Sequence, residues 1–365
     1  MNLKKFIAAI LVCGILISVA SAADGSIDNS AQCAILIEAD TGRVLYEKNP
    51  DEPNLIASTT KIMTALIVIE NCDMDAIVEI KPEYTGIEGS SVYLQEGEKL
   101  TVKELLYCML LKSGNDAATA LACYTAGSIE AFAELMNEKV TQLNLENTCF
   151  ENPHGLDGDN QYSSARDLAL ITAEAMKHEV FCEIVATESI TIGQRYLTNH
   201  NKMLKFYDGA TGVKTGYTKQ AGRTLVTSAE RDGTRLIVVT LNDPNDWADH
   251  TALLDYGFEM YETVSLCSEG EVIAELQVIG GIEESVVVQA ATDCTLTLAQ
   301  DESVTSKVYL PPFVYAQVER GAAAGKICWY INGEKISETM LVYAHSIERG
   351  DEREYTLWEK IKRLF

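Results

Sequence analysis

The sequence predicts an α/β (α+β) domain, an antiparallel sheet flanked by helices, followed by a small all-β sandwich and a C-terminal amphipathic helix. Three observations support this. Strand-like segments lie near residues 31–48 and again between 190 and 241, at the two ends of the first domain. A mainly helical pattern fills 101–180, and short β-branched runs separated by turn residues recur from 259 to 348. The 365 residues are enough for two domains.

The first 22 residues have the pattern of a secretory signal peptide. Lys4 and Lys5 precede an apolar run over 6–19, and Ala20-Ser-Ala forms a small-residue cleavage site. The run is short for a transmembrane anchor, which is the alternative interpretation. The mature chain then begins at Ala23, and we expect an exported protein.

The first domain is expected over 23–258. Residues 31–48 predict a hairpin around Asp40-Thr-Gly, and Ser58 is expected to open a long apolar helix. Thr101 and Glu104 form a capping-box pattern, and Ser164 to Asp167 is a second helix start. Strands near 190–197, 213–217, 223–229 and 235–241 precede a helix at about 246–258, so the sheet takes strands from both ends of the domain.

The β-rich region over 259–348 ends in an expected amphipathic helix over 349–365. On a helical projection Leu357, Trp358 and Ile361 share an arc of roughly 120° with the last two residues, and the basic side chains lie outside it. A helix of this kind lies in a membrane interface and is too short to cross a bilayer. Docking on the protein itself is the alternative.

Composition excludes several classes of function. The formal net charge of −25 argues against nucleic-acid binding. The five histidines include no H-x-H or H-E-x-x-H pattern, so we expect no metal and no other cofactor. Nine of the ten cysteines follow the signal segment, in an odd number without C-x-x-C pairs, and are interpreted as small buried apolar residues rather than a disulfide framework.

Ser58-Thr-Thr-Lys61 is the first element with catalytic potential. The i, i+3 spacing at a helix start places the hydroxyl and the amine on one face. A serine needs a base to become a nucleophile, and a buried lysine kept neutral can serve. Alone, the S-x-x-K pattern is common and weak.

Two further short motifs follow. Ser113-Gly-Asn115 offers a hydroxyl for proton relay and an amide for a substrate carbonyl, although a plain capping turn has the same composition. Lys214-Thr215-Gly216 lies on an expected strand, where a lysine and a threonine hydroxyl suit a free carboxylate and glycine permits close approach of a ligand.

S-x-x-K, S-D-N and K-T-G in this order are typical of serine β-lactamases and penicillin-binding proteins, and here the middle motif is Ser-Gly-Asn rather than Ser-Asp-Asn. With Ser-Gly-Asn in the middle, the chain resembles the low-molecular-mass D-alanyl-D-alanine carboxypeptidases of the S11 type, closely over about 30–258. Further segments carry the resemblance: Ile56-Ala-Ser-Thr-Thr-Lys-Ile-Met-Thr-Ala, Asn152-Pro-His-Gly-Leu, Tyr162-Ser-Ser-Ala-Arg-Asp, Gly212-Val-Lys-Thr-Gly-Tyr-Thr and Leu254-Asp-Tyr-Gly-Phe. The sandwich and the terminal helix match the family's layout by position.

The resemblance implies a transpeptidase-like catalytic fold and a role for each motif residue. Ser58 would attack the carbonyl between the last two D-alanines of a peptidoglycan stem peptide, Lys61 would take its proton, and Ser113 would return a proton to the leaving D-alanine. Asn115 would hold the peptide. The remaining substrate-binding residues are Lys214 and Thr215 for the carboxylate, Gly216, and Tyr217, whose N–H joins that of Ser58 in the oxyanion hole.

The resemblance also implies β-lactams as covalent inhibitors and a location at the outer face of the cytoplasmic membrane, with residues 351–365 as the membrane contact. Three alternatives stay open. A D,D-endopeptidase uses the same machinery, a class A-like β-lactamase would need a glutamate such as Glu151 to activate water, and a catalytically silent wall-binding protein would need no chemistry. The oligomeric state, stem-peptide residue three and the biological role are not readable from the sequence.

Overall fold

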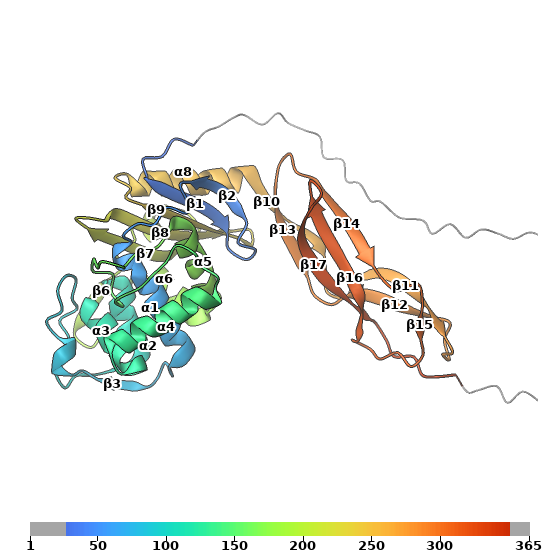
Figure 1. The fold of residues 1–365 in the computed structure, drawn as a ribbon, viewed down its shortest axis with the longest axis horizontal. Coiled ribbons are helices and arrows are strands. Elements are labelled where there is room, and N and C mark those ends of the chain that lie inside the picture. The colour runs from blue at the N-terminus through green and yellow to red at the C-terminus, as the bar shows by residue number, and fades with distance from the viewer. Residues whose placement is uncertain (1–26, 351–365) are drawn as a thin grey trace, which may run out of the picture. The chain divides into compact units, whose positions relative to one another are not determined.

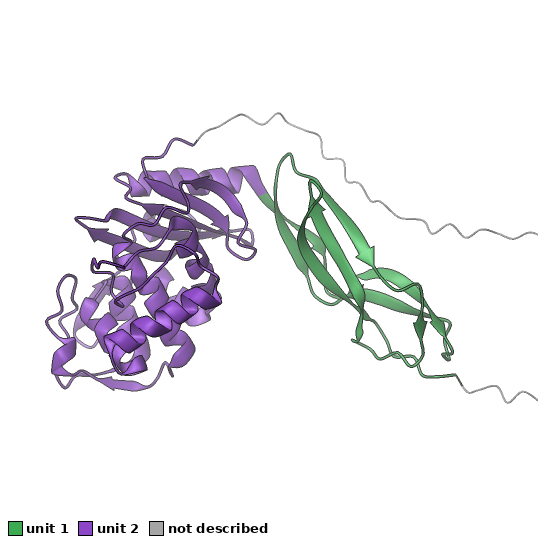
Figure 2. Ribbon diagram, in the orientation of Figure 1, with its two compact units in different colours: residues 1–23, 262–365 green, residues 24–261 purple. Residues whose placement is uncertain are grey.

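The computed structural model describes residues 27–350, which fall into two compact units (Figures 1 and 2). The larger unit ends at Tyr261 and the smaller unit begins at Glu262. The expected signal peptide and membrane-contacting segment 351–365 lie outside the described residues. Arg349, assigned to the terminal helix from sequence, instead forms a β-bridge with Gly281. No helix within 27–350 is both long and apolar enough to cross a membrane.

An antiparallel five-stranded sheet forms the centre of the larger unit, in the order β2-β1-β9-β8-β7. Its strands are β1 (Cys33–Glu38), β2 (Val44–Lys48), β7 (Ala210–Thr218), β8 (Gly222–Arg231) and β9 (Thr234–Leu241). The β1–β9 pairing runs from Cys33 opposite Leu241 to Glu38 opposite Leu236. The predicted sheet, with strands from both ends of the domain, is confirmed.

The sheet is covered on both faces. Ile35 and Ile37 of β1 belong to the core formed with α1–α6, whereas Leu36 packs in a second core with Leu253 and Leu254. Side chains of a strand alternate between faces, so every residue of β1 is buried. The helices are α1 (Lys61–Asn71), α2 (Val102–Leu111), α3 (Asn115–Ala126), α4 (Ile129–Gln142), α5 (Ala165–Ala175), α6 (Glu179–Ala186), α7 (Met203–Phe206) and α8 (Asp246–Met260).

Local capping explains where two of these helices begin. The Thr101 side chain accepts from the N–H of Glu104, whose carboxylate accepts from the N–H of Thr101, so the predicted capping box at α2 is confirmed. Ser164 caps α5 by accepting from the N–H of Asp167, but the Asp167 carboxylate accepts from Asn147 and Thr148 instead of the Ser164 N–H, so the reciprocal half of the box is absent there.

Two small two-stranded sheets lie outside the central sheet. One pairs β3 (Ile77–Glu79) with β4 (Lys99–Thr101), and the other pairs β5 (Ser189–Ile192) with β6 (Arg195–Thr198). The sequence suggested strand structure over 190–197. Gly193, with φ of +57°, instead turns the chain there and divides the segment into two strands.

The smaller unit is a β-sandwich of a six-stranded sheet, in the order β14-β16-β17-β12-β11-β15, and a two-stranded sheet, β10-β13. Its strands are β10 (Tyr261–Cys267), β11 (Val272–Ile279), β12 (Ser285–Ala290), β13 (Cys294–Ala299), β14 (Val304–Tyr309), β15 (Val314–Tyr315), β16 (Ala323–Ile331) and β17 (Glu334–Tyr343). Val286, Val288, Leu341 and Ile347 form the centre of its core. The predicted all-β domain is therefore confirmed.

The nine cysteines within the described residues are all free thiols. Cys108 is completely buried among apolar side chains, where burial raises the pKa of its thiol to about 12, and it behaves as a small apolar core residue. Cys33 is also completely buried, but its sulfur accepts a hydrogen bond from the Asn54 amide.

Candidate active site

Ser58 lies on a short turn between the sheet and the first long helix. The turn is the 3₁₀ helix η1 (Ala57–Thr60), and α1 begins only at Lys61. The sequence predicted that Ser58 itself would open the α-helix. Ala57 instead adopts a left-handed conformation with φ of 47°, and the N–H and hydroxyl of Thr59 both donate to the carbonyl of Ile56. One tight turn therefore precedes the helix.

Two glycines let neighbouring segments approach this turn. A Cβ on Gly155 would lie 1.8 Å from the carbonyl oxygen of Ala57, and a Cβ on Gly216 would lie 3.1 Å from the backbone nitrogen of Ser58. A side chain at either position would collide with its neighbours. The segment after α4 and strand β7 thus enclose Ser58 from two sides.

The Lys61 amine has three partners in the interior. Its Nζ lies 3.1 Å from the Ser58 hydroxyl oxygen, 2.7 Å from Oδ1 of Asn115 and 2.6 Å from the carbonyl oxygen of His154. The side chain is completely buried. A neutral amine has two N–H donors and one lone pair, which match two carbonyl acceptors and one hydroxyl donor.

Electrostatics favours the neutral form of Lys61. Burial, followed by the positive charge of Lys214, holds the pKa of the Lys61 amine well below its usual range, and the carboxylate of Asp116 opposes this shift. The pKa of the Lys61 amine is thus shifted in the direction that a general base requires.

Ser113 and Lys214 form a second pair beside the first. Ser113 follows α2 with φ of 61°, and the Lys214 Nζ donates to its hydroxyl at 3.1 Å and to the Thr215 carbonyl at 2.8 Å. Lys214 is 1 % exposed, and burial lowers the pKa of its amine to about 7. This lysine can change its charge near neutral pH.

Asn115 connects Lys61 to a neighbouring loop. Its Oδ1 accepts from Lys61, its Nδ2 donates to the Glu88 carbonyl at 2.5 Å, and its N–H donates to the Ser90 carbonyl at 2.7 Å. Asn115 is 3 % exposed, so its side-chain amide bonds mainly to groups in the protein interior.

A cavity of about 360 Å³ opens in front of Ser58 and is called the Ser58 cavity below. Five of the predicted site residues line it: Ser58, Ser113, Thr215, Gly216 and Tyr217. The other three, Lys61, Asn115 and Lys214, do not line it but contact Ser58, Ser113 or one another from behind. The eight predicted residues therefore form one continuous cluster.

The cavity also contains residues that the sequence did not single out. Arg223 of β8 stands opposite Tyr217 of β7 and donates two hydrogen bonds through Nη2 and one through Nε to the carboxylate of Asp246. Trp247 lies beside the guanidinium, and Lys202 is a second lining cation. No local motif marks Arg223, because it reaches the site through strand pairing and its partner comes from α8.

The two histidines near the site are neutral in the physiological pH range. Burial, assisted by nearby lysines, lowers the pKa of both His154 and His200 to about 4. His154 contributes its backbone carbonyl to Lys61, whereas His200 lines the Ser58 cavity. Among residues 27–350, no group of three or more His, Cys, Asp or Glu side chains could hold a metal ion.

Comparison with known proteins gives a consistent result. A family model described as D-alanyl-D-alanine carboxypeptidase matches residues 18–245, and one described as penicillin-binding protein 5, C-terminal domain, matches 261–349. The D-alanyl-D-alanine carboxypeptidase DacF of Bacillus subtilis is 32 % identical, covering 95 % of this chain and 96 % of that protein. DacC of Escherichia coli is 33 % identical, with 88 % and 85 % covered. Penicillin binding protein 5 of Haemophilus influenzae has a similar structure, with a TM-score of 0.76, 30 % identity, and 90 % and 100 % of the chains covered.

Proposed function

Because the chain belongs to the D-alanyl-D-alanine carboxypeptidase family, whose members are serine hydrolases, we propose that Ser58 is the residue that forms its acyl-enzyme. The substrate is the D-Ala-D-Ala end of a peptidoglycan stem pentapeptide, and the terminal D-alanine is the leaving group. One observation carries this assignment. The Ser58 hydroxyl lies 3.1 Å from the amine of a completely buried lysine whose other two contacts are hydrogen-bond acceptors.

Acylation begins with proton transfer from Ser58 to Lys61. Asn115 and the His154 carbonyl accept the two N–H bonds of the neutral amine and direct its lone pair at the hydroxyl. The Ser58 oxygen then bonds to the carbonyl carbon of the penultimate D-alanine. The N–H groups of Ser58 and Tyr217 are assigned to the oxyanion, since Gly216 brings β7 against the Ser58 turn.

Ser113 is placed to return a proton to the departing D-alanine. Its hydroxyl lines the Ser58 cavity and accepts a hydrogen bond from Lys214. With a pKa of about 7, the Lys214 amine can supply a proton through this hydroxyl and recover it from water. Water then attacks the acyl-enzyme ester and gives its proton to the neutral Lys214 amine, while Lys61 returns its proton to the Ser58 oxygen as the shortened stem peptide leaves.

The substrate carboxylate is assigned to the end of the cavity formed by β7 and β8. Thr215 offers its hydroxyl there, Lys214 adds positive charge from behind the strand, and Arg223 faces the same space from β8. Asp246 uses Nε and Nη2 of Arg223, so Nη1 is the guanidinium nitrogen assigned to the substrate. The role of Asn115 in holding the substrate peptide stays a prediction, because its Nδ2 donates to the Glu88 carbonyl and its Oδ1 accepts from Lys61.

The geometry does not favour a class A-like β-lactamase. Glu151, the nearest candidate for activating water, accepts a hydrogen bond from Asn160 and does not line the Ser58 cavity. The intact Ser58–Lys61 contact likewise gives no support to a catalytically silent wall-binding protein. A D,D-endopeptidase acting on cross-links uses the same residues. Its action would depend on whether a cross-linked peptide fits the Ser58 cavity.

An enzyme acting on peptidoglycan works outside the cytoplasm, and we propose how this chain reaches its substrate. Residues 1–22 act as the signal peptide, and residues 351–365 bind the outer face of the cytoplasmic membrane through Trp358 and neighbouring apolar side chains.

Covalent labelling tests the proposal. The chain lacking residues 1–22 and 351–365 is incubated with fluorescent penicillin, digested and analysed by mass spectrometry. We expect a stable adduct on Ser58 that is absent from Ser58→Ala, together with D-alanine release from a D-Ala-D-Ala pentapeptide. Rapid destruction of the penicillin without an adduct would assign β-lactamase activity instead.

A further inference from the structure

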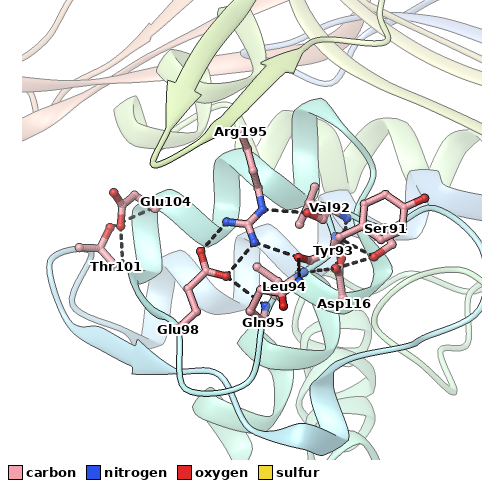
Figure 3. Close-up of polar contacts among 10 residues, drawn as sticks. All are labelled: Ser91, Val92, Tyr93, Leu94, Gln95, Glu98, Thr101, Glu104, Asp116 and Arg195. Carbon is pink, nitrogen blue, oxygen red and sulfur yellow. Dashed lines mark hydrogen bonds and ion pairs between the residues drawn. The ribbon is translucent and has the colours of Figure 1, made fainter.

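Arg195, the first residue of β6, reaches from the β5–β6 hairpin to the loop that precedes α2 (Figure 3). Its Nε donates to the Val92 carbonyl at 2.8 Å, and its Nη2 donates to the Tyr93 carbonyl at 2.9 Å. The same guanidinium forms a bidentate ion pair with Glu98, including an Nη2–Oε2 distance of 2.7 Å. One side chain therefore joins the hairpin to three acceptors in the loop.

The opposite side of this loop is held by Asp116 (Figure 3). The carboxylate of Asp116 accepts from the N–H of Val92 at 3.1 Å, from the N–H of Leu94 at 3.1 Å and from the Ser91 hydroxyl at 2.6 Å. Asp116 is 1 % exposed. Segment 91–94 is consequently fixed from both sides, with Arg195 on its carbonyls and Asp116 on its N–H groups.

The held segment continues directly into the active site. Ser90, the residue before it, lines the Ser58 cavity and accepts from the N–H of Asn115. Asn115 precedes Asp116 in the chain and accepts from the Lys61 amine. A displacement of segment 91–94 therefore acts on the cavity wall through Ser90 and on the general base through Asn115.

The segment needs external support because its backbone is strained at Tyr93. Tyr93 has φ of 58°, a conformation that costs an L-residue about 1–2 kcal/mol. Its side chain is 79 % exposed, so packing contributes little, and its N–H bonds to the Ser91 hydroxyl. The hydrogen bond from Arg195 to the Tyr93 carbonyl helps to hold this conformation.

We propose that the Arg195–Glu98 pair positions the active site, by clamping segment 91–94 so that Ser90 and Asn115 keep the geometry that acylation of Ser58 requires. This inference rests on the proposed function and assigns Arg195 as a positioning residue, since it contacts neither Ser58 nor Lys61. Misplacement of catalytic groups by about 1 Å lowers rates by about 10²-fold.

The test compares Arg195→Gln with a matched variant of another arginine clamp. Arg166, at the start of α5, makes an equivalent surface ion pair with Asp51 and Glu47 that touches no active-site residue. Arg166→Gln therefore reports the loss of a comparable pair without the link to the site. The two further variants are Arg195→Lys, which keeps the charge, and Glu98→Gln, which leaves both backbone carbonyls bonded to Arg195.

The measurements are the second-order rate of acylation by fluorescent penicillin as a function of pH, and the melting temperature. We expect acylation about 10- to 100-fold slower in Arg195→Gln at temperatures where it is folded, with partial recovery in Arg195→Lys and a smaller loss in Glu98→Gln. The acid limb of the rate profile should move to higher pH in Arg195→Gln and not in Arg166→Gln. The reason is that water admitted beside Lys61 raises the pKa of its amine, while Lys214 and Asp116 remain its charged neighbours.

Two results separate the possible failures. Absence of wild-type acylation would overturn the proposed function itself. Normal wild-type acylation with equal rates and equal pH profiles in Arg195→Gln and Arg166→Gln would overturn the positioning role alone and leave Arg195 as a contributor to stability.

Discussion

Gly155 and Ala57 meet backbone to backbone: a Cβ on Gly155 would lie 1.8 Å from the Ala57 carbonyl oxygen. Ala57 immediately precedes Ser58, so this contact fixes the turn that presents the nucleophile. Gly155 also has φ of +83°, which favours glycine.

Gly155→Ala is therefore expected to displace the Ser58 turn. The overlap is expected to lower the free energy of unfolding by about 1–3 kcal/mol, in addition to the cost of the left-handed conformation. The rate of penicillin labelling should fall as well. Gly127→Ala is the control, because Gly127 has φ of +88° with no atom within 4 Å of the added Cβ. Melting temperature and labelling rate are compared, and equal effects in the two variants would contradict the packing argument.

Lys61→Arg should slow acylation by about 10²- to 10⁴-fold, since a guanidinium stays protonated and has no lone pair for the Ser58 proton. In the wild type the rate should fall as the pH drops through the depressed pKa of Lys61, because protonation removes the base. Stopped-flow measurement of the acylation rate from acidic to neutral pH tests both the effect of Lys61→Arg and the pH dependence of the wild type. Labelling at the wild-type rate in a folded Lys61→Arg protein would exclude Lys61 as the base.

Lys214 should make stability depend on pH in the alkaline range. Its pKa is about 7 in the folded protein and about 10.4 when unfolded, so the unfolded chain binds more protons between these values. The free energy of unfolding should therefore increase as pH rises from about 7 to 10. Urea unfolding of Lys214→Met should show a smaller increase than the wild type. The exposed Lys219→Met should keep the wild-type slope, and a parallel loss of slope there would refute the assignment.

Arg223→Gln tests the carboxylate assignment. Loss of one charge-assisted hydrogen bond is expected to raise KM for a D-Ala-D-Ala peptide about 10-fold or more, with a smaller change in kcat. Lys219→Gln removes the same charge from an exposed position outside the cavity and should leave KM unchanged. Binding of a peptide with a C-terminal amide should be insensitive to Arg223→Gln. If Arg223→Gln weakened binding of the amide peptide to the same extent, Arg223 would contact a part of the substrate other than its carboxylate.

The sequence was informative wherever a signal is local. Runs of β-branched and apolar residues bounded by turn residues predicted the strands, and capping residues predicted the starts of α2 and α5. The i, i+3 spacing of Ser58 and Lys61 likewise reflects helix geometry, and the structure places these two groups 3.1 Å apart.

Features created by pairing of distant segments were not predictable in the same way. Arg223 enters the cavity because β8 pairs with β7, and its neutralising partner Asp246 comes from α8. The His154 carbonyl that binds Lys61 is a backbone atom, so the residue type at position 154 does not indicate this contact. Arg195 and Val92 are about a hundred residues apart in the sequence, so their contact is apparent only in the folded protein.

The pairing of β1 with β9 also determines when the enzyme can exist during synthesis. Cys33 emerges early from the ribosome, but its partner Leu241 follows about two hundred residues later. Until then β1 pairs only with β2, and β7, which closes the Ser58 turn, has no five-stranded sheet to complete. A nascent chain shorter than this can form neither the complete central sheet nor the catalytic centre that rests on it.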